Sequence, residues 1–544
     1  MTNGRTPSMT RRAFLGVVGT GATAAIAGSL SVGGRAAHAQ APTKGGTLRI
    51  LQTEPAVGFN PVLEGGNWPQ TQRMVYNGLT DFGLKGETVP GLAQRWTISP
   101  ASDTFTFHLT PGVVFHDGKE LTSADVKFTY EMVLDPKVGS EFQSFIPNLK
   151  TVETPDKSTV IFHFDGPNVL FMPGVSALGI IPKHLWDQGD PMKSPYLSKP
   201  VGTGPFVLKE WRRSDALIFE ANRQYFRKDR PYLDQVAFRV VSDAAVGMEA
   251  FKNGELDAVF SEGVPGGPPY GKIRELLDAK PPNIVATQFV QGFTQNLWMN
   301  SAKPPFSNLK VRQAVAHAIN KQLIIKTLLY GFGKVQDSCI GDLPGTSWAH
   351  DPAIKSHDYS VQKASQLLDE AGYPRRGATR FSVTILATEG FRVKLSEALR
   401  AMLAQVGIES SIKSYTWPTY FARISQQRDT AAAVWTIFNS NQFDPSRAVV
   451  NLDGSQIKPG GANWCQWNNA QATRLMQDAM STGDQQKRKV MYHRLQAIVR
   501  DEVPVVPLYS ALGIDLWYQK VHGLHSLDTL TGTMETVEDA WMSS

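Results

Sequence analysis

Two strand–helix–strand patterns constrain the fold of this chain more than any other feature of its sequence. The first spans residues 233–260 and the second spans residues 381–414, and in each a helical segment separates two apolar, strand-like segments. A helical crossover of this kind returns the chain to the same sheet and makes the two strands parallel. The sequence therefore predicts an α/β fold built on parallel sheets.

A strand-rich part precedes the first pattern. Residues 104–109 and 159–164 each alternate apolar and polar side chains, as half-buried strands do. Between them lies an Asp-Gly turn signal, and Thr122 stands three positions before Asp125, which is the spacing of a capping box. We expect strands and one capped helix here.

The second half of the chain has the clearest helical periodicity. Between residues 308 and 330, apolar side chains recur three and four positions apart. Residues 360–371 repeat this pattern and end at Gly372, and residues 470–500 are also helical in pattern. Residues 503–509 then form an apolar strand bounded by prolines. This half should therefore cover its strands with amphipathic helices.

Residues 1–39 have the organisation of an export signal. An Arg-Arg pair at 11–12 precedes a Gly/Ala-rich apolar stretch, and Ala-His-Ala at 37–39 supplies a small-x-small cleavage site. The paired arginines before Phe-Leu resemble the twin-arginine export signal. We expect cleavage before Gln40; the alternative is a short membrane helix that stays uncleaved, which the Gly and Thr content disfavours.

The positive charge of the chain lies mostly in this segment. The whole chain carries 55 Lys and Arg against 49 Asp and Glu, a net charge of +6. Residues 1–39 contain four arginines and no acidic residue, which leaves a net charge of +2 on the rest. No basic run with interleaved aromatic residues stands out there. The charge therefore gives no support to a nucleic-acid partner.

The two cysteines bear on membrane attachment. A lipid-anchored exported protein needs a cysteine at its cleavage point, whereas Cys339 and Cys465 lie far downstream. No later stretch of about 18 apolar residues could span a bilayer. We therefore expect a soluble periplasmic protein without a lipid anchor or membrane insertion. An oxidising compartment permits a Cys339–Cys465 disulfide, and the sequence leaves that pairing open.

Signatures of enzymes and of metal sites are missing from the mature part. It has no C-x-x-C, H-E-x-x-H, G-x-S-x-G or P-loop motif. A G-x-G-x-x-A match at 19–24 falls within the export signal, and no strand precedes it. His522 and His525 are the closest histidine pair, but no compact set of metal ligands appears. We predict no catalytic residue, no metal and no cofactor.

Seven segments in a fixed order carry a family resemblance. They are GGTLRI at 45–50, VPGLAQRW at 89–96, FHLTPGVVFHDGKELTSADVKFTYE at 107–131, VGTGPFVL at 201–208, NSAKPPFSNLKVRQAVAHAIN at 300–320, YSVQKASQLLDEAGY at 359–373 and VPVVPLY at 503–509. In this order the chain resembles the extracytoplasmic solute-binding protein family 5, the receptors of ABC importers for oligopeptides, dipeptides and nickel.

The resemblance implies a two-lobed periplasmic-binding-protein fold with a hinge, a central ligand cleft and an extra subdomain inserted in the first lobe. The first lobe would combine residues 40–80, 201–290 and 508–544, the insert would be 81–200, and the second lobe 291–507. The chain would then cross twice between the lobes. A ligand that contacts both lobes favours the closed form.

Aromatic side chains near turn-rich segments are the first candidates for ligand contacts. Trp298, Trp417, Tyr420, Trp435 and Trp464 all lie in the expected second lobe. Rigid rings supply contact area at low entropy cost. Trp298 ranks first, because its stretch lines the cleft in the family that the chain resembles. Burial in a core is the alternative for each tryptophan.

One departure from the family pattern concerns the charge of the site. Peptide-binding members carry a segment close to W-x-A-D-Y-x-D-P, whose first aspartate faces the α-amine of the peptide. Aligned on Asp444, Phe438 replaces the tryptophan and Asn441 replaces that aspartate. A neutral amide offers an ammonium no formal charge. The ligand would then lack a strongly cationic amine, as a modified peptide, an opine-like conjugate or a glycan does. Asp444 has the alternative role of capping the following helix.

These observations predict a monomeric periplasmic receptor. It would capture a small peptide or peptide-like solute and deliver it to the permease of an ABC importer, without catalysing a reaction. Two other classes stay open: a twin-arginine-exported enzyme, against which the missing cofactor motifs count, and a chaperone or sensor partner on the same scaffold.

Overall fold

The computed structural model describes residues 41–543, apart from 54–55, 57, 64–68, 84–86, 261–268, 389, 428–432, 441–443, 459–460 and 527–531. The predicted export signal, 1–39, lies outside these residues. The chain divides into two units, and Thr43–Ser544 is the unit described below. Within the described ranges, no helix is long and apolar enough to cross a membrane.

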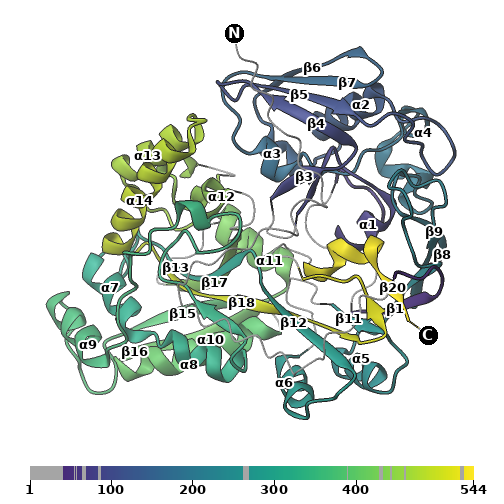
Figure 1. The fold of residues 1–544 in the computed structure, drawn as a ribbon. Helices are drawn as coiled ribbons and strands as arrows, with labels where there is room; N and C mark the ends of the chain where they lie inside the picture. Colours follow the sequence, from purple (N-terminus) through teal and green to yellow (C-terminus); the bar gives the residue numbers. More distant parts are fainter. Residues whose placement is uncertain are drawn as a thin grey trace, which may run out of the picture. The chain divides into compact units, whose positions relative to one another are not determined.

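A twelve-stranded sheet is the framework of the described part (Figure 1). Its main path runs β16-β15-β17-β13-β18-β11-β1-β10-β9-β8, and β12 and β14 both pair with β18. The strands are β1 (Thr47–Gln52), β8 (Phe206–Arg212), β9 (Ala216–Ala221), β10 (Gln235–Val240), β11 (Ala258–Val259), β12 (Ile284–Val290), β13 (Phe293–Met299), β14 (Gly333–Val335), β15 (Phe381–Thr388), β16 (Ile408–Tyr415), β17 (Ala433–Ser440) and β18 (Val505–Tyr518).

Both predicted strand–helix–strand patterns are confirmed. In the second, α10 (Phe391–Gln405) connects β15 to β16, and the two strands are parallel neighbours. In the first, α5 (Ala244–Lys252) connects β10 to β11, but β1 lies between these strands and pairs with both in parallel. The opening strand of the chain thus completes the first parallel group.

Strand β18 belongs to both halves of the sheet. Its first residues pair with β13, from Val505 opposite Trp298, and its last seven pair with β12, from Leu512 opposite Val290. In Figure 1 the yellow β18 runs across the sheet between these partners. Gly513 faces Phe289, and a Cβ there would lie 2.1 Å from the ring. The chain therefore passes twice between the two parallel groups at one place, through adjacent strands.

A separate four-stranded antiparallel sheet forms in the strand-rich part, in the order β4-β5-β7-β6. Its strands are β4 (Ala93–Ile98), β5 (Thr104–Leu109), β6 (Leu149–Asp156) and β7 (Thr159–Phe164). The predicted capping box is confirmed: the Thr122 backbone N–H donates to Asp125, and α2 (Ser123–Leu134) follows. Buried phenylalanines, among them Phe107, Phe162 and Phe171, pack edge to face or tilted in its core.

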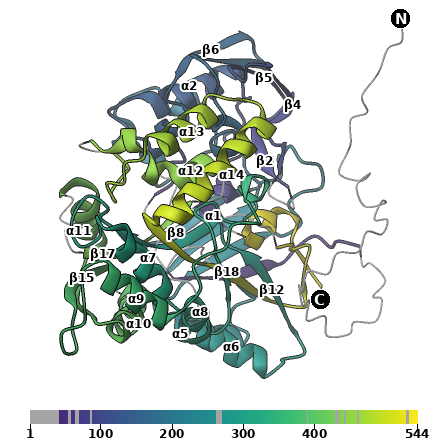
Figure 2. The same cartoon turned by 90° about the vertical axis from the view of Figure 1, so that its left-hand side faces the viewer.

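Two helices predicted as continuous are each broken by a capping residue. The 308–330 pattern becomes α7 (Leu309–Ala318) and α8 (Lys321–Leu328), because the Asn320 side chain accepts a hydrogen bond from the Leu323 backbone N–H and so caps α8. The 470–500 pattern becomes α13 (Ala470–Met480) and α14 (Gln485–Glu502), because Asp484 caps α14. Figure 2 shows α13 and α14 side by side.

Further α-helices and two small sheets accompany these elements. The helices are α1 (Pro69–Val75), α3 (Phe171–Gly174), α4 (Lys183–Trp186), α6 (Tyr270–Asp278), α9 (Val361–Glu370), α11 (Trp417–Phe421) and α12 (Pro445–Val449). Two small sheets pair β2 (Thr80–Phe82) with β3 (Thr88–Pro90) and β19 (Val521–His522) with β20 (Trp541–Met542).

Candidate functional site

The carboxyl ends of three parallel strands meet at one edge of the large sheet. β15 ends at Thr388, β16 ends at Tyr415, and Phe438 lies near the end of β17. The helices α10 and α11 begin directly after β15 and β16. In open α/β sheets, ligands bind outside the carboxyl ends of the strands. This edge is therefore the candidate site.

Arg392 lies at this edge, in the first turn of α10. It is only 7 % exposed, and its guanidinium faces two rings, with the Trp417 centroid at 5.2 Å and the Phe438 centroid at 5.7 Å. Nη1 donates to Thr388 Oγ1 at 3.1 Å, whereas Nε has no hydrogen-bond partner. No ion pair joins Arg392 to a carboxylate in the described part of the chain. Among the described residues, this buried cation has no anionic partner.

The energetics of this arrangement favour an incoming anion. Burial lowers the pKa of Arg392, and the nearby Tyr420 and Tyr509 hydroxyls act in the opposite direction. Even so, an arginine keeps its proton at neutral pH. A desolvated, unpaired charge is costly, and a carboxylate would relieve that cost through two parallel N–H···O bonds. The group is suited to binding a carboxylate rather than to catalysing a reaction.

Aromatic side chains surround this cation. Trp417 is 43 % exposed and stacks on Tyr420 and Phe421, with centroid distances of 5.9 and 5.7 Å. Phe421 meets Trp464 edge to face at 5.3 Å. Trp417, Phe438 and Trp464 keep exposed or half-buried surface. They supply flat apolar area beside the buried charge.

Three of the predicted contact residues are buried in one apolar cluster. Trp298, Tyr420 and Trp435 are each at most 1 % exposed. Trp298 Nε1 donates to the Ile437 carbonyl at 3.4 Å, and Tyr420 donates its hydroxyl to the Thr436 carbonyl at 2.7 Å. In this structure they are core residues. Burial in a core is the alternative that the sequence left open for the tryptophans.

Asp444 is fully engaged within the protein. Its carboxylate accepts from the Ser446 backbone N–H at 2.9 Å and so caps α12. Arg488 Nη2 donates to both carboxylate oxygens, at 2.6 and 2.7 Å, and both side chains are buried. Asn441 lies outside the described residues. Ligand contact by any of the eight predicted residues stays a prediction.

Arg392 was not among the predicted contact residues, which were chosen as aromatic and polar or acidic side chains. A usable signal was present: this arginine closely follows a predicted parallel strand, at the start of a helix whose neighbouring positions are apolar. An arginine at the carboxyl end of such a strand is a candidate for anion binding.

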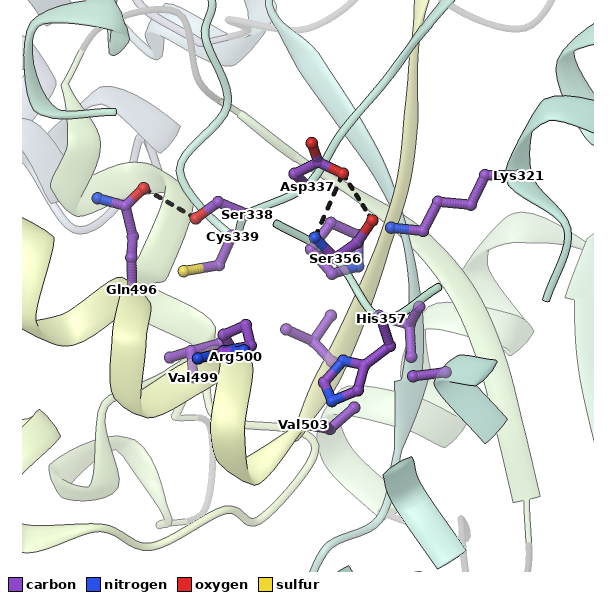
Figure 3. Close-up of a pocket in the computed structure, with 14 residues that line it drawn as sticks. Lys321, Asp337, Ser338, Cys339, Ser356, His357, Gln496, Val499, Arg500 and Val503 are labelled. Carbon is purple, nitrogen blue, oxygen red and sulfur yellow. Dashed lines mark hydrogen bonds between the residues drawn. The ribbon is translucent and has the colours of Figure 1, made fainter. Parts of the chain in front are cut away.

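A cavity lies away from this edge (Figure 3). It measures about 20 Å³, which fits a water molecule rather than a peptide. Figure 3 shows Lys321, Asp337 and Ser356 around it, and Ser356 Oγ donates to Asp337 at 2.6 Å. Cys339 lines it as well. Among the described residues, no group of three or more His, Cys, Asp or Glu is placed to hold a metal ion.

The two cysteines are free thiols in this structure, and both are buried. Burial raises the pKa of each thiol to about 12. Neither is therefore a reactive thiolate at neutral pH.

Lys321 gives a prediction about pH. Burial lowers its pKa to about 8, although Asp337 acts in the opposite direction, whereas an unfolded lysine titrates near 10.4. Between these values the unfolded chain binds more protons, so stability rises with pH. The unfolding free energy of wild type minus that of Lys321→Met should increase by roughly 2–3 kcal/mol from pH 8 to pH 10.5, measured by urea unfolding. The exposed Lys326→Met on the same helix should give no such rise; a flat Lys321 difference would contradict the prediction.

Comparison with known proteins agrees with this fold. The profile of bacterial extracellular solute-binding proteins, family 5 Middle, matches residues 87–459. Heme-binding protein A of Haemophilus influenzae is 29% identical over 509 residues, 88% of this chain and 89% of that protein. Di/tripeptide-binding protein 1 of Pseudomonas aeruginosa is 30% identical over 482 residues, 83% of this chain and 86% of that protein.

A solved structure extends the comparison. The PBP AgaA from A. tumefaciens R10, in complex with agropinic acid, is 26% identical, with a TM-score of 0.74 over 92% of this chain and 99% of that one. The family profile covers more than half of the chain. The chain therefore belongs to the bacterial extracellular solute-binding proteins of family 5.

Proposed function

We propose that this protein is the substrate-binding component of an ABC importer, and that its solute is a peptide or peptide-like acid whose carboxylate binds Arg392. The observation that carries the proposal is the buried guanidinium, which has no anionic partner in the part of the chain that the structure describes. An arginine fork matches the two oxygens of a carboxylate. Trp417 and Phe438 then flank the bound group with their rings.

The relatives support this ligand class. One of them is a di/tripeptide-binding protein, and the AgaA structure holds agropinic acid. Peptides and this acid share a small size and an acidic group. The amine end of a peptide has less support in this chain, because Asn441 is neutral and Asp444 is paired with Arg488. The carboxylate should therefore contribute more to affinity than the amine.

The same proposal includes the two-lobed organisation. The first lobe combines 40–80, 201–290 and 508–544, with the insert at 81–200 and the second lobe at 291–507. The paired crossings through β12, β13 and β18 support a hinge at this place. The protein works as a monomer that hands its solute to the permease, after export by the twin-arginine pathway and removal of residues 1–39.

Chemically blocked peptides test the ligand class. Trialanine, its N-acetyl form and its C-terminal amide are compared by thermal shift and calorimetric titration with the mature protein. The free and acetylated forms should bind within a few-fold of one another, whereas amidation should weaken binding about 10- to 100-fold, since it removes a charge-assisted contact. A ligand at 100 times its dissociation constant adds about 2.7 kcal/mol of stability, which a melting curve detects.

Two results would contradict the proposal. If acetylation abolished binding while amidation had no effect, the amine and not the carboxylate would be the recognised group. If no peptide or opine-like acid stabilised the protein, the ligand class would be wrong.

A further inference from the structure

Residues 93–175, which contain the four-stranded sheet, are called the four-stranded sheet unit below. Two contacts join this unit to α12 and to the loop before α14. In the first, the Arg447 guanidinium of α12 lies over the Phe145 ring at 4.6 Å, and its Nη1 is 3.5 Å from Ser144 Oγ. In the second, Gly483, directly before α14, lies against Ser102 in the β4–β5 turn. These residues are more than 300 positions apart in the chain, so each contact exists only while the two regions are together.

The Phe145 side of the first contact is held in place by contacts within its own region. Phe145 is buried, and its ring packs so closely on Gly174 that a Cβ there would lie 2.2 Å from it. Asn168 Nδ2 also donates to the Phe145 carbonyl at 3.0 Å. The ring is thus a fixed surface on the four-stranded sheet unit.

The Arg447 side is equally fixed. Helix α12 begins at the Asp444 cap, and the buried pair of Asp444 with Arg488 ties that cap to α14. Asn439 Nδ2 of β17 donates to the Ala448 carbonyl at 2.6 Å. A half-buried Arg447 side chain therefore projects from a rigid base onto a rigid ring, and little ordering entropy opposes the contact.

The Gly483 contact is separate from the first. A Cβ built at Gly483 would lie 2.5 Å from Ser102 Oγ and 3.2 Å from its Cβ. Gly483 itself is exposed and belongs to the loop between α13 and α14. A side chain at this position would therefore interfere with the approach of the sheet unit rather than with the local fold.

We propose that the Arg447–Phe145 contact is a latch, which holds the four-stranded sheet unit against α12 and so sets the affinity for the solute without touching it. The inference rests on the proposed function in one respect: solute must bind the form in which these regions meet. A contact that exists only when the two regions meet raises the population of that form. The apparent affinity scales with the population of the form that can bind solute. Arg447 is thus a positioning residue.

Hydrogen exchange of the ligand-free mature protein tests the latch directly. In Arg447→Ala, exchange should become faster both at residues 141–145 and at α12, and small-angle scattering should give a larger radius of gyration. Arg213→Ala is the matched control, because Arg213 lies over Trp211 at 4.5 Å within a single hairpin. Unchanged exchange and scattering in Arg447→Ala would overturn the latch.

Affinity gives a second readout, with trialanine as the probe. Arg447→Ala should weaken binding about fivefold, as expected for one partly exposed cation–π contact, while Arg213→Ala leaves it unchanged. Arg447→Lys should fall between, and Gly483→Val should weaken binding by obstructing the second contact. Equal affinities of wild type and Arg447→Ala would overturn the latch. If trialanine fails to bind the wild type, that result counts against trialanine as a ligand and not against the latch, which the ligand-free measurements still decide.

Discussion

Replacing Arg392 by methionine should weaken solute binding at least 100-fold while leaving the ligand-free protein as stable as the wild type, or more stable. Truncating one partner of a buried, hydrogen-bonded charge pair costs about 2–5 kcal/mol of binding free energy. In the ligand-free protein the same guanidinium is buried, and no described residue supplies it with an anion, so an apolar side chain of similar length removes a desolvation cost. Affinity and stability should therefore move in opposite directions.

Calorimetric titration and urea unfolding measure the two effects separately. Arg392→Lys keeps the charge but loses the planar fork, and it should retain part of the affinity. Arg274→Met is a suitable control, because Arg274 also lies over a ring, that of Phe332 at 4.3 Å, yet belongs to α6 and not to the candidate site. Wild-type affinity in Arg392→Met, or a loss of several kcal/mol in its stability, would refute the assigned role.

Asp444→Asn should destabilise the protein by about 3–5 kcal/mol, because it strands the buried Arg488 guanidinium without its counter-charge. Asparagine is as good a helix cap as aspartate, so the cap on α12 should survive. The loss therefore reports the ion pair and not the cap.

Asp484→Asn provides the matched control for this loss. Asp484 caps α14 in the same way, but its side chain is 48 % exposed. Its replacement should change the unfolding free energy by no more than about 0.5 kcal/mol. Adding Arg488→Met to Asp444→Asn should recover much of the loss, since the stranded charge is then gone. Similar losses of unfolding free energy in Asp444→Asn and Asp484→Asn would contradict the prediction that the buried ion pair stabilises the protein more than an exposed cap does.

The periodicity of the sequence was sufficient to predict the type of fold. Alternation of apolar residues and helical crossovers are local signals, and they identified β10, β11, β15 and β16 with the helices between them. The insertion of β1 between β10 and β11 depends on pairing between residues about 200 positions apart, which no local pattern encodes. The breaks before Lys321 and Gln485 did have a local cause, in Asn320 and Asp484, but the apolar pattern continued across them.

The candidate site was less accessible to sequence reasoning. Whether a tryptophan is a core residue or a contact residue depends on neighbours from other elements. Trp298 and Trp435, for example, lie opposite each other on adjacent strands, and both are buried. The unpaired state of Arg392 likewise depends on side chains from α10, α11 and β17 together. Such a feature exists only after the chain has folded.

The way in which β12, β13 and β18 meet has a mechanical consequence. Sheets of few strands tolerate a wider range of twist than broad sheets do. The β18 ladder passes from β12 to β13 within a few residues, with the Gln291 N–H bonded to the Ala511 carbonyl at 3.2 Å. Around the crossing, β18 pairs with β12, β13 and β14. In the proposed closure, rotation of one half against the other would twist the sheet at this place.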